Sequence, residues 1–71
     1  MNSNLQIIRI ADVQRITTLR RSTIYKKLHT DSTFPRPIQL SDSTARGAPI
    51  GFVLGEVLLW IESRISKREG K

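Results

Sequence analysis

The sequence has 71 residues, no cysteine, and 12 Lys and Arg against 6 Asp and Glu, which gives a net charge of +6. A chain this short forms one small domain with a thin core, so we expect residues 1–71 to be a single domain with frayed ends at 1–4 and 69–71. The composition excludes disulfides and thiolate metal sites, and its single histidine is too few for an ordinary zinc site, so we expect no cofactor.

The N-terminal segment leads into a first predicted helix over about residues 11–16. Apolar residues between positions 5 and 10 anchor the chain, and Asp12 lies in the first turn of the helix, where the helix dipole favours an acid. Val13 and Ile16 give the helix one buried edge. Thr17 and Thr18 are β-branched and continue a helix poorly, so we expect the helix to end there.

A second predicted helix runs from residue 20 or 21 to residue 29, within the segment LRRSTIYKKLHT at residues 19–30. Ile24 and Leu28 lie four residues apart and therefore share one face, whereas cations, hydroxyls and a tyrosine occupy other faces. Leu19 is the apolar residue of the connection. Two short helices joined by three or four residues are typical of a helix-turn-helix.

The chain then changes to an extended hairpin. Residues 30–33 have the composition of a turn, and Pro35 and Pro37 exclude a helix. Residues 38–40 alternate as a short strand does, residues 41–49 form a loop of mostly small residues, and residues 50–53 return as the partner strand. The long loop of this β-hairpin carries one cation, Arg46, near its tip.

The third predicted helix starts at about Val53 and is amphipathic. Trp60 lies at the edge of its apolar stripe and Leu59 on the opposite, exposed side. The stripe is expected to close the core and consists of Val53, Leu54, Val57, Leu58, Ile61 and Ile65. The sequence thus predicts a mainly α fold with a small β-hairpin, a three-helix winged helix-turn-helix domain.

Positive charge is concentrated in the first two thirds of the chain. Residues 1–46 hold eight cations against three acids, and residues 13–30 hold five cations and no acid. Such a one-sided field favours a polyanion, of which nucleic acid is the default. A membrane surface is disfavoured because the basic segment lacks a broad apolar face, and a merely basic protein is the remaining alternative.

We expect a cytoplasmic protein. The start MNSNLQ lacks the charged region and apolar run of a signal peptide, and the longest apolar run, residues 57–61, is too short to cross a membrane.

Three fragments, in their order and spacing, resemble a known family. They are RSTIY at residues 21–25, FPRPI at 34–38 and EVLLWI at 56–61. Together they are similar to the AlpA-type regulators of prophages and integrative elements, a group of excisionase-like, MerR-like winged-helix proteins, over about residues 9–68. The resemblance implies a bacterial, nucleoid-associated protein that binds double-stranded DNA and regulates an excision or integrase gene or assists excision.

The chain departs from the family pattern in three places. Thr18 and Arg20 stand where the family usually has Gly and Ser before the second helix, so we expect Thr18 or Ser22 to cap that helix. Gly51 and Phe52 replace the usual Gly-Trp of the return strand, and the 41–49 loop is longer than usual.

The predicted DNA-binding surface combines the polar side of the second helix with two arginines of the hairpin region. Basic side chains can pair with guanine and hydroxyls reach bases or phosphates, although half or more of such hydrogen bonds go to the DNA backbone. Arg21, near the end of the helix that usually enters the groove, is the leading candidate for a base contact. The full set is Arg20, Arg21, Ser22, Thr23, Tyr25, Lys26, Lys27, Arg36 and Arg46.

Other functional classes lack their signatures. The chain has no His paired with a carboxylate, no cysteine nucleophile and no Gly-rich phosphate loop, so we expect no enzyme. The leading alternative is a protein-binding adaptor or anti-repressor that does not read DNA sequence, with Leu59 as a candidate contact. A single-stranded RNA binder is disfavoured because exposed aromatic residues are scarce. One copy covers a short site, so further copies or an integrase are expected partners.

Overall fold

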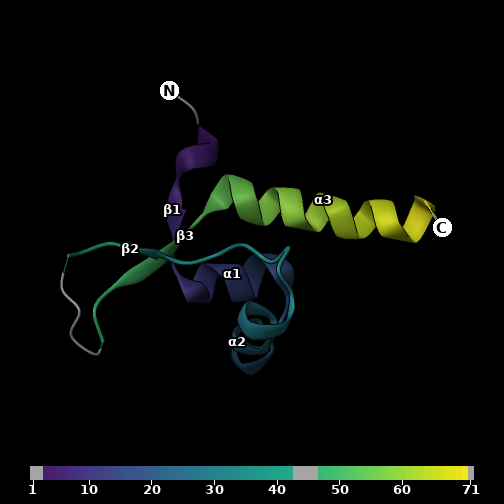
Figure 1. Cartoon of the computed structure of the whole chain (residues 1–71). Helices are drawn as coiled ribbons and strands as arrows, with labels where there is room; N and C mark the ends of the chain where they lie inside the picture. Colours follow the sequence, from purple (N-terminus) through teal and green to yellow (C-terminus); the bar gives the residue numbers. More distant parts are fainter. Residues whose placement is uncertain (1–2, 43–46, 71) are drawn as a thin grey trace.

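The structure is a computed structural model that describes residues 3–42 and 47–70 (Figure 1). It contains three α-helices and a small antiparallel sheet, which confirms the predicted mainly α winged helix-turn-helix class. The elements, in chain order, are the 3-10 helix η1 (Ser3–Leu5), β1 (Ile7–Ile8), α1 (Ile10–Thr17), α2 (Arg21–Thr30), β2 (Ile38–Gln39), β3 (Ile50–Val53) and α3 (Leu54–Gly70).

The sheet has three strands in the order β1-β3-β2, with β3 at its centre. Ile8 lies opposite Phe52 across one ladder, and Ile38 lies opposite Gly51 across the other. The hairpin was predicted, but β1 was not. Two residues are too few for a strand periodicity, and β1 is defined only by a partner more than forty positions away.

Each of six segments supplies at least one side chain to a single core. Ile24 of α2 and Val13 of α1 are fully buried, as the spacing within each helix predicts. The rings of Phe34 and Trp60 meet edge to face, with centroids 4.9 Å apart, a favoured aromatic geometry. The buried set is Ile8, Val13, Ile24, Phe34, Phe52, Val57 and Trp60.

The apolar stripe of α3 is less completely buried than predicted. Trp60 lies within the core, whereas Leu58 is 39 % and Ile65 is 44 % exposed. The C-terminal half of α3 extends past α1, away from the sheet, so helical spacing continues beyond the part of the core that could cover it (Figure 1). Leu5 and Ile7, expected as anchors, are also exposed, and Ile8 is the buried residue of that segment.

The turn between α1 and α2 is held by the hydroxyl of Thr17. This hydroxyl donates to the carbonyl of Val13 at 2.6 Å and accepts the amide of Leu19 at 3.3 Å. Thr18 follows with a φ of 63°, in the left-handed region. The predicted cap of α2 is therefore wrong. Thr18 is the C-cap of α1, Ser22 lies inside the first turn of α2, and the N-cap of α2 is Arg20, whose side chain makes no capping hydrogen bond.

Candidate nucleic-acid interface

The helix α2 is fastened along one edge and exposed along the other. Ile24 is fully buried and Leu28 packs against the core. The opposite side exposes Arg21, Ser22, Tyr25 and Lys26, and we call these four residues the α2 outer face. Because α2 contains no Asp or Glu, its outer face carries positive charge that no neighbouring acid on the same helix offsets.

At the start of α2, two consecutive arginines are exposed, Arg20 as the N-cap and Arg21 as the first helical residue. The guanidinium carbon of Arg21 lies 6.0 Å from the centroid of the Tyr25 ring, at the outer limit of a cation–π contact. The ring of Tyr25 therefore supports the guanidinium of Arg21 one turn away.

Two of the predicted binding residues of α2 are turned toward the protein. Thr23 and Lys27 are only half-exposed. The ammonium of Lys27 lies 5.5 Å from the centroid of the Trp60 ring, so it covers the core indole of α3 and is directed away from the α2 outer face.

Arg36 closes the C-terminal end of α2. Its guanidinium donates hydrogen bonds to the carbonyl of Leu28 and, at 3.1 Å, to the carbonyl of Asp31. The last carbonyls of a helix lack partners within the helix, so a positive donor at this position satisfies them and complements the helix dipole. Arg36 is itself exposed, next to the FPRP segment.

The carboxylate of Asp31, next to this helix end, has a structural role in the turn that follows α2. The hydroxyl and the backbone amide of Thr33 donate to it at 2.6 and 2.9 Å, and these hydrogen bonds lower the pKa of Asp31 below its usual range. The indole of Trp60 and the charge of Lys27 contribute to the same pKa shift, although the Trp60 N–H falls short of hydrogen-bond geometry.

A residue outside the predicted set lies beside the α2 outer face. Arg9, the exposed N-cap of α1, lines a hollow of about 320 Å³ together with Arg21, Tyr25 and residues 47–50 at the base of the hairpin loop. The sequence signal was weak, because Arg9 stands alone among apolar residues whose evident role is to anchor the chain. Its position beside α2 follows only from the tertiary fold.

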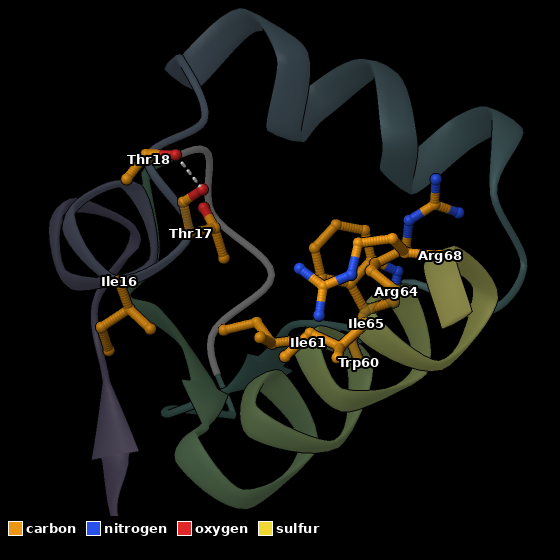
Figure 2. A pocket seen from close by; sticks show the side chains of 8 residues that line it. All are labelled: Ile16, Thr17, Thr18, Trp60, Ile61, Arg64, Ile65 and Arg68. Carbon is orange, nitrogen blue, oxygen red and sulfur yellow. Dashed lines mark hydrogen bonds between the residues drawn. The ribbon is translucent and has the colours of Figure 1, made fainter. Parts of the chain in front are cut away.

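A second hollow, of about 390 Å³, lies between the turn after α1 and the C-terminal half of α3. Thr17 and Thr18 approach it from the turn, and Ile61, Arg64 and Ile65 approach it from α3 (Figure 2). Its walls are mainly apolar, and it takes no part in the α2 outer face.

The predicted set therefore divides into three groups. Arg20, Arg21, Ser22, Tyr25 and Lys26 are exposed together at and after the start of α2. Thr23, Lys27 and Arg36 are half-exposed or bonded to other parts of the protein. Arg46 lies outside the described residues.

The geometry agrees with a comparison of the sequence with protein families. The model of the family described as prophage CP4-57 regulatory protein (AlpA) matches residues 6–65. The chain belongs to the AlpA family. Neither the curated proteins nor the solved structures yielded a match to it.

Membership in the AlpA family identifies the chain as a prophage regulatory protein and confirms the resemblance found in the sequence. The resemblance implied a glycine at the position of Thr18, and the φ of 63° at Thr18 is the conformation that glycine adopts without a steric cost.

The described part of this AlpA-family chain has no cluster of three His, Asp or Glu residues that could hold a metal ion. Within residues 3–42 and 47–70, no helix combines the length and the apolar character needed to cross a membrane.

Proposed function

We propose that this AlpA-family protein is a sequence-specific regulator that binds double-stranded DNA on a prophage or integrative element. In this proposal it controls an excision or integrase gene or assists excision. The N-terminal part of α2 enters the major groove, as second helices of helix-turn-helix domains do, and the 41–49 loop acts as a wing. No catalytic step and no cofactor are involved, and the site of action is the nucleoid in the cytoplasm.

The observation that carries this proposal is the α2 outer face in its helix-turn-helix setting. Arg21 and Lys26 are exposed there with the hydroxyls of Ser22 and Tyr25, and the helix holds no acid. These are the side chains that bind phosphates and the edges of bases. Charge alone would suit any polyanion, but an exposed polar edge on the second helix of this motif fits a DNA groove.

The size of the domain favours binding by several copies. Its principal extents are 43 × 32 × 20 Å, and one turn of B-DNA is about 34 Å long. One copy therefore covers about one turn, which specifies few base pairs. We propose that further copies on repeated sites, or an integrase bound beside it, complete the recognition.

Footprinting on the DNA that surrounds its own gene tests the proposal. A protected site that resists competition by random-sequence duplex would support specific binding. The variant Arg21→Ala/Lys26→Ala should lose this protection while its thermal unfolding stays nearly unchanged, because both side chains are exposed. A variant that protects the same site equally well would show that the α2 outer face is not the binding surface.

The alternative function, a protein-binding adaptor, is favoured by one observation on α3. Leu58 and Leu59 are 39 % and 65 % exposed on adjacent positions. A variant Leu59→Asp should leave DNA binding intact under our proposal. If this variant abolishes regulation in cells while the wild-type protein protects no DNA site, the adaptor function is the correct one.

A further inference from the structure

We infer that Arg9, Arg21 and Tyr25 form a clamp for one phosphate of the DNA backbone, between α2 and the base of the 41–49 loop. The inference rests on the proposed function. It adds Arg9 to the DNA-binding residues and changes the role of Arg21 from reading a base to holding the backbone.

The clamp is formed by three segments that are distant in the sequence. Arg9 comes from the start of α1, Arg21 and Tyr25 come from the first two turns of α2, and residues 47–50 close the hollow from the hairpin. The hollow of about 320 Å³ is therefore placed between the two elements that should enter neighbouring grooves of the duplex. In duplex DNA, the sugar–phosphate backbone separates neighbouring grooves.

The charge of the hollow suits an anion. Two of its lining side chains are arginines, and none of the described residues that line it is acidic. The nearest acid along the chain, Asp12, already accepts the backbone amide of Arg9 at 3.1 Å and forms an ion pair with Arg15. Arg9 is exposed, and its guanidinium can bind a phosphate with two parallel hydrogen bonds.

The contact between Arg21 and Tyr25 sets the direction of Arg21. Because the guanidinium carbon lies 6.0 Å from the centroid of the ring and both side chains line the hollow, Arg21 faces the hollow that Arg9 and residues 47–50 also line. Tyr25 is exposed, and its hydroxyl supplies a further donor to the same anion. Base contacts then fall to Ser22 and Lys26, the remaining members of the α2 outer face.

The clamp is tested by measuring the affinity for a short random-sequence duplex at several salt concentrations with fluorescence anisotropy. Each phosphate contact contributes about 0.9 to the slope of log K against log salt. We expect Arg9→Gln to reduce the slope by about one and to weaken binding about five- to tenfold at low salt, with Arg9→Lys in between. The matched control is Arg64→Gln, which removes the same charge from an exposed position of α3 outside the hollow and should leave the slope unchanged.

Three results would overturn the inference, and they are distinguishable. If Arg9→Gln binds like the wild-type protein while Arg21→Gln/Lys26→Gln does not, the proposed function stands and the clamp is wrong. If Arg9→Gln and Arg64→Gln weaken binding equally, Arg9 acts only through net charge. If the wild-type protein itself binds no duplex, the proposed function fails together with the clamp.

The role of Arg21 has its own test, once a footprinted site is in hand. The variant Arg21→Gln should weaken binding to that site and to random duplex by the same factor, because a phosphate contact carries no sequence information. Lys26→Gln should reduce the ratio of the two affinities. A larger loss of this ratio for Arg21→Gln than for Lys26→Gln would restore Arg21 as a base-reading residue.

Discussion

At the scale of single residues, Thr18 is the position with a left-handed backbone in the turn between α1 and α2. Its φ of 63° places a β-branched side chain in a conformation that glycine favours. The hydroxyl of Thr18 donates to the carbonyl of Thr17, a local contact that does not replace the missing glycine. Thr18 joins the helix that supports the fold to the helix of the α2 outer face, so the strained residue lies next to the proposed site.

We predict that Thr18→Gly stabilises the protein by up to about 1 kcal/mol. The left-handed conformation costs a residue with a Cβ about 1–2 kcal/mol, and glycine removes this cost. The greater conformational freedom of glycine in the unfolded chain offsets part of the resulting stabilisation. Urea denaturation measures the difference. Thr17→Gly is the control and should destabilise, since the Thr17 hydroxyl holds the turn. A loss of stability for Thr18→Gly would contradict the strain.

We predict that the fold loses stability at low pH because Asp12 and Asp31 become protonated. The hydrogen bond from the Arg9 amide and the contact with Arg15 lower the pKa of Asp12. The two hydrogen bonds from Thr33 lower the pKa of Asp31. A carboxylate with a lowered folded-state pKa stabilises the fold above its unfolded pKa of about 3.9, and this contribution disappears as the pH falls through the folded-state pKa.

Urea midpoints measured for Asp31→Asn and the wild-type protein at several pH values test this dependence. The variant should be less stable at neutral pH, and the difference should shrink as the pH falls below about 4. A difference that stays constant across this range would show that the charge of Asp31 does not stabilise the fold.

At the scale of elements, the N-cap position of α2 carries a positive charge in place of a side chain that would cap the helix. Arg20 is its N-cap and makes no capping hydrogen bond, whereas a serine there would satisfy a free backbone amide. We predict that Arg20→Ser raises the free energy of unfolding by about 0.5–2 kcal/mol and weakens DNA binding. Urea denaturation and anisotropy on the same preparation measure both. A variant that gains stability and keeps full affinity would show that Arg20 does not contact DNA.

Two adjacent lysines of α2 have different roles. Lys26 is exposed on the α2 outer face, whereas the Lys27 ammonium lies over the Trp60 ring. We predict that Lys27→Ala lowers the free energy of unfolding by about 0.5–1 kcal/mol with a small effect on DNA affinity. Lys26→Ala should weaken DNA binding with a small effect on the free energy of unfolding. Each of the two substitutions is therefore the control for the other. Equal effects of the two substitutions on DNA affinity would contradict this division.

The sequence predicted the elements better than the site. Residues 11–16 and 20–29 were expected as helices and residues 50–53 as the return strand, and the structure has α1, α2 and β3 at these positions. Helical spacing is local, so it can be read from one segment. The partners of Lys27, Arg36 and Arg9 are an indole, two carbonyls and a hollow from other segments. A sequence cannot assign such partners without the fold.

At the scale of the whole molecule, the hairpin and the C-terminal half of α3 extend in opposite directions from one small core (Figure 1). Cations lie on α2 as well as on α3, but the environments of these cations differ. Arg21 and Lys26 belong to the acid-free helix α2, whereas Arg64 and Lys67 belong to α3, which also contains glutamates. Net charge therefore predicts a polyanionic partner, and only the fold predicts which face meets it.

The central claim is that the α2 outer face, and not net charge, binds DNA. The most direct test compares two charge-matched variants, Arg21→Gln/Lys26→Gln and Arg64→Gln/Lys67→Gln, by anisotropy with one duplex at one salt concentration. Each removes two exposed cations. We predict that the α2 variant loses at least about tenfold in affinity, while the α3 variant stays within about twofold of the wild-type protein. Equal losses for the two variants would contradict the claim.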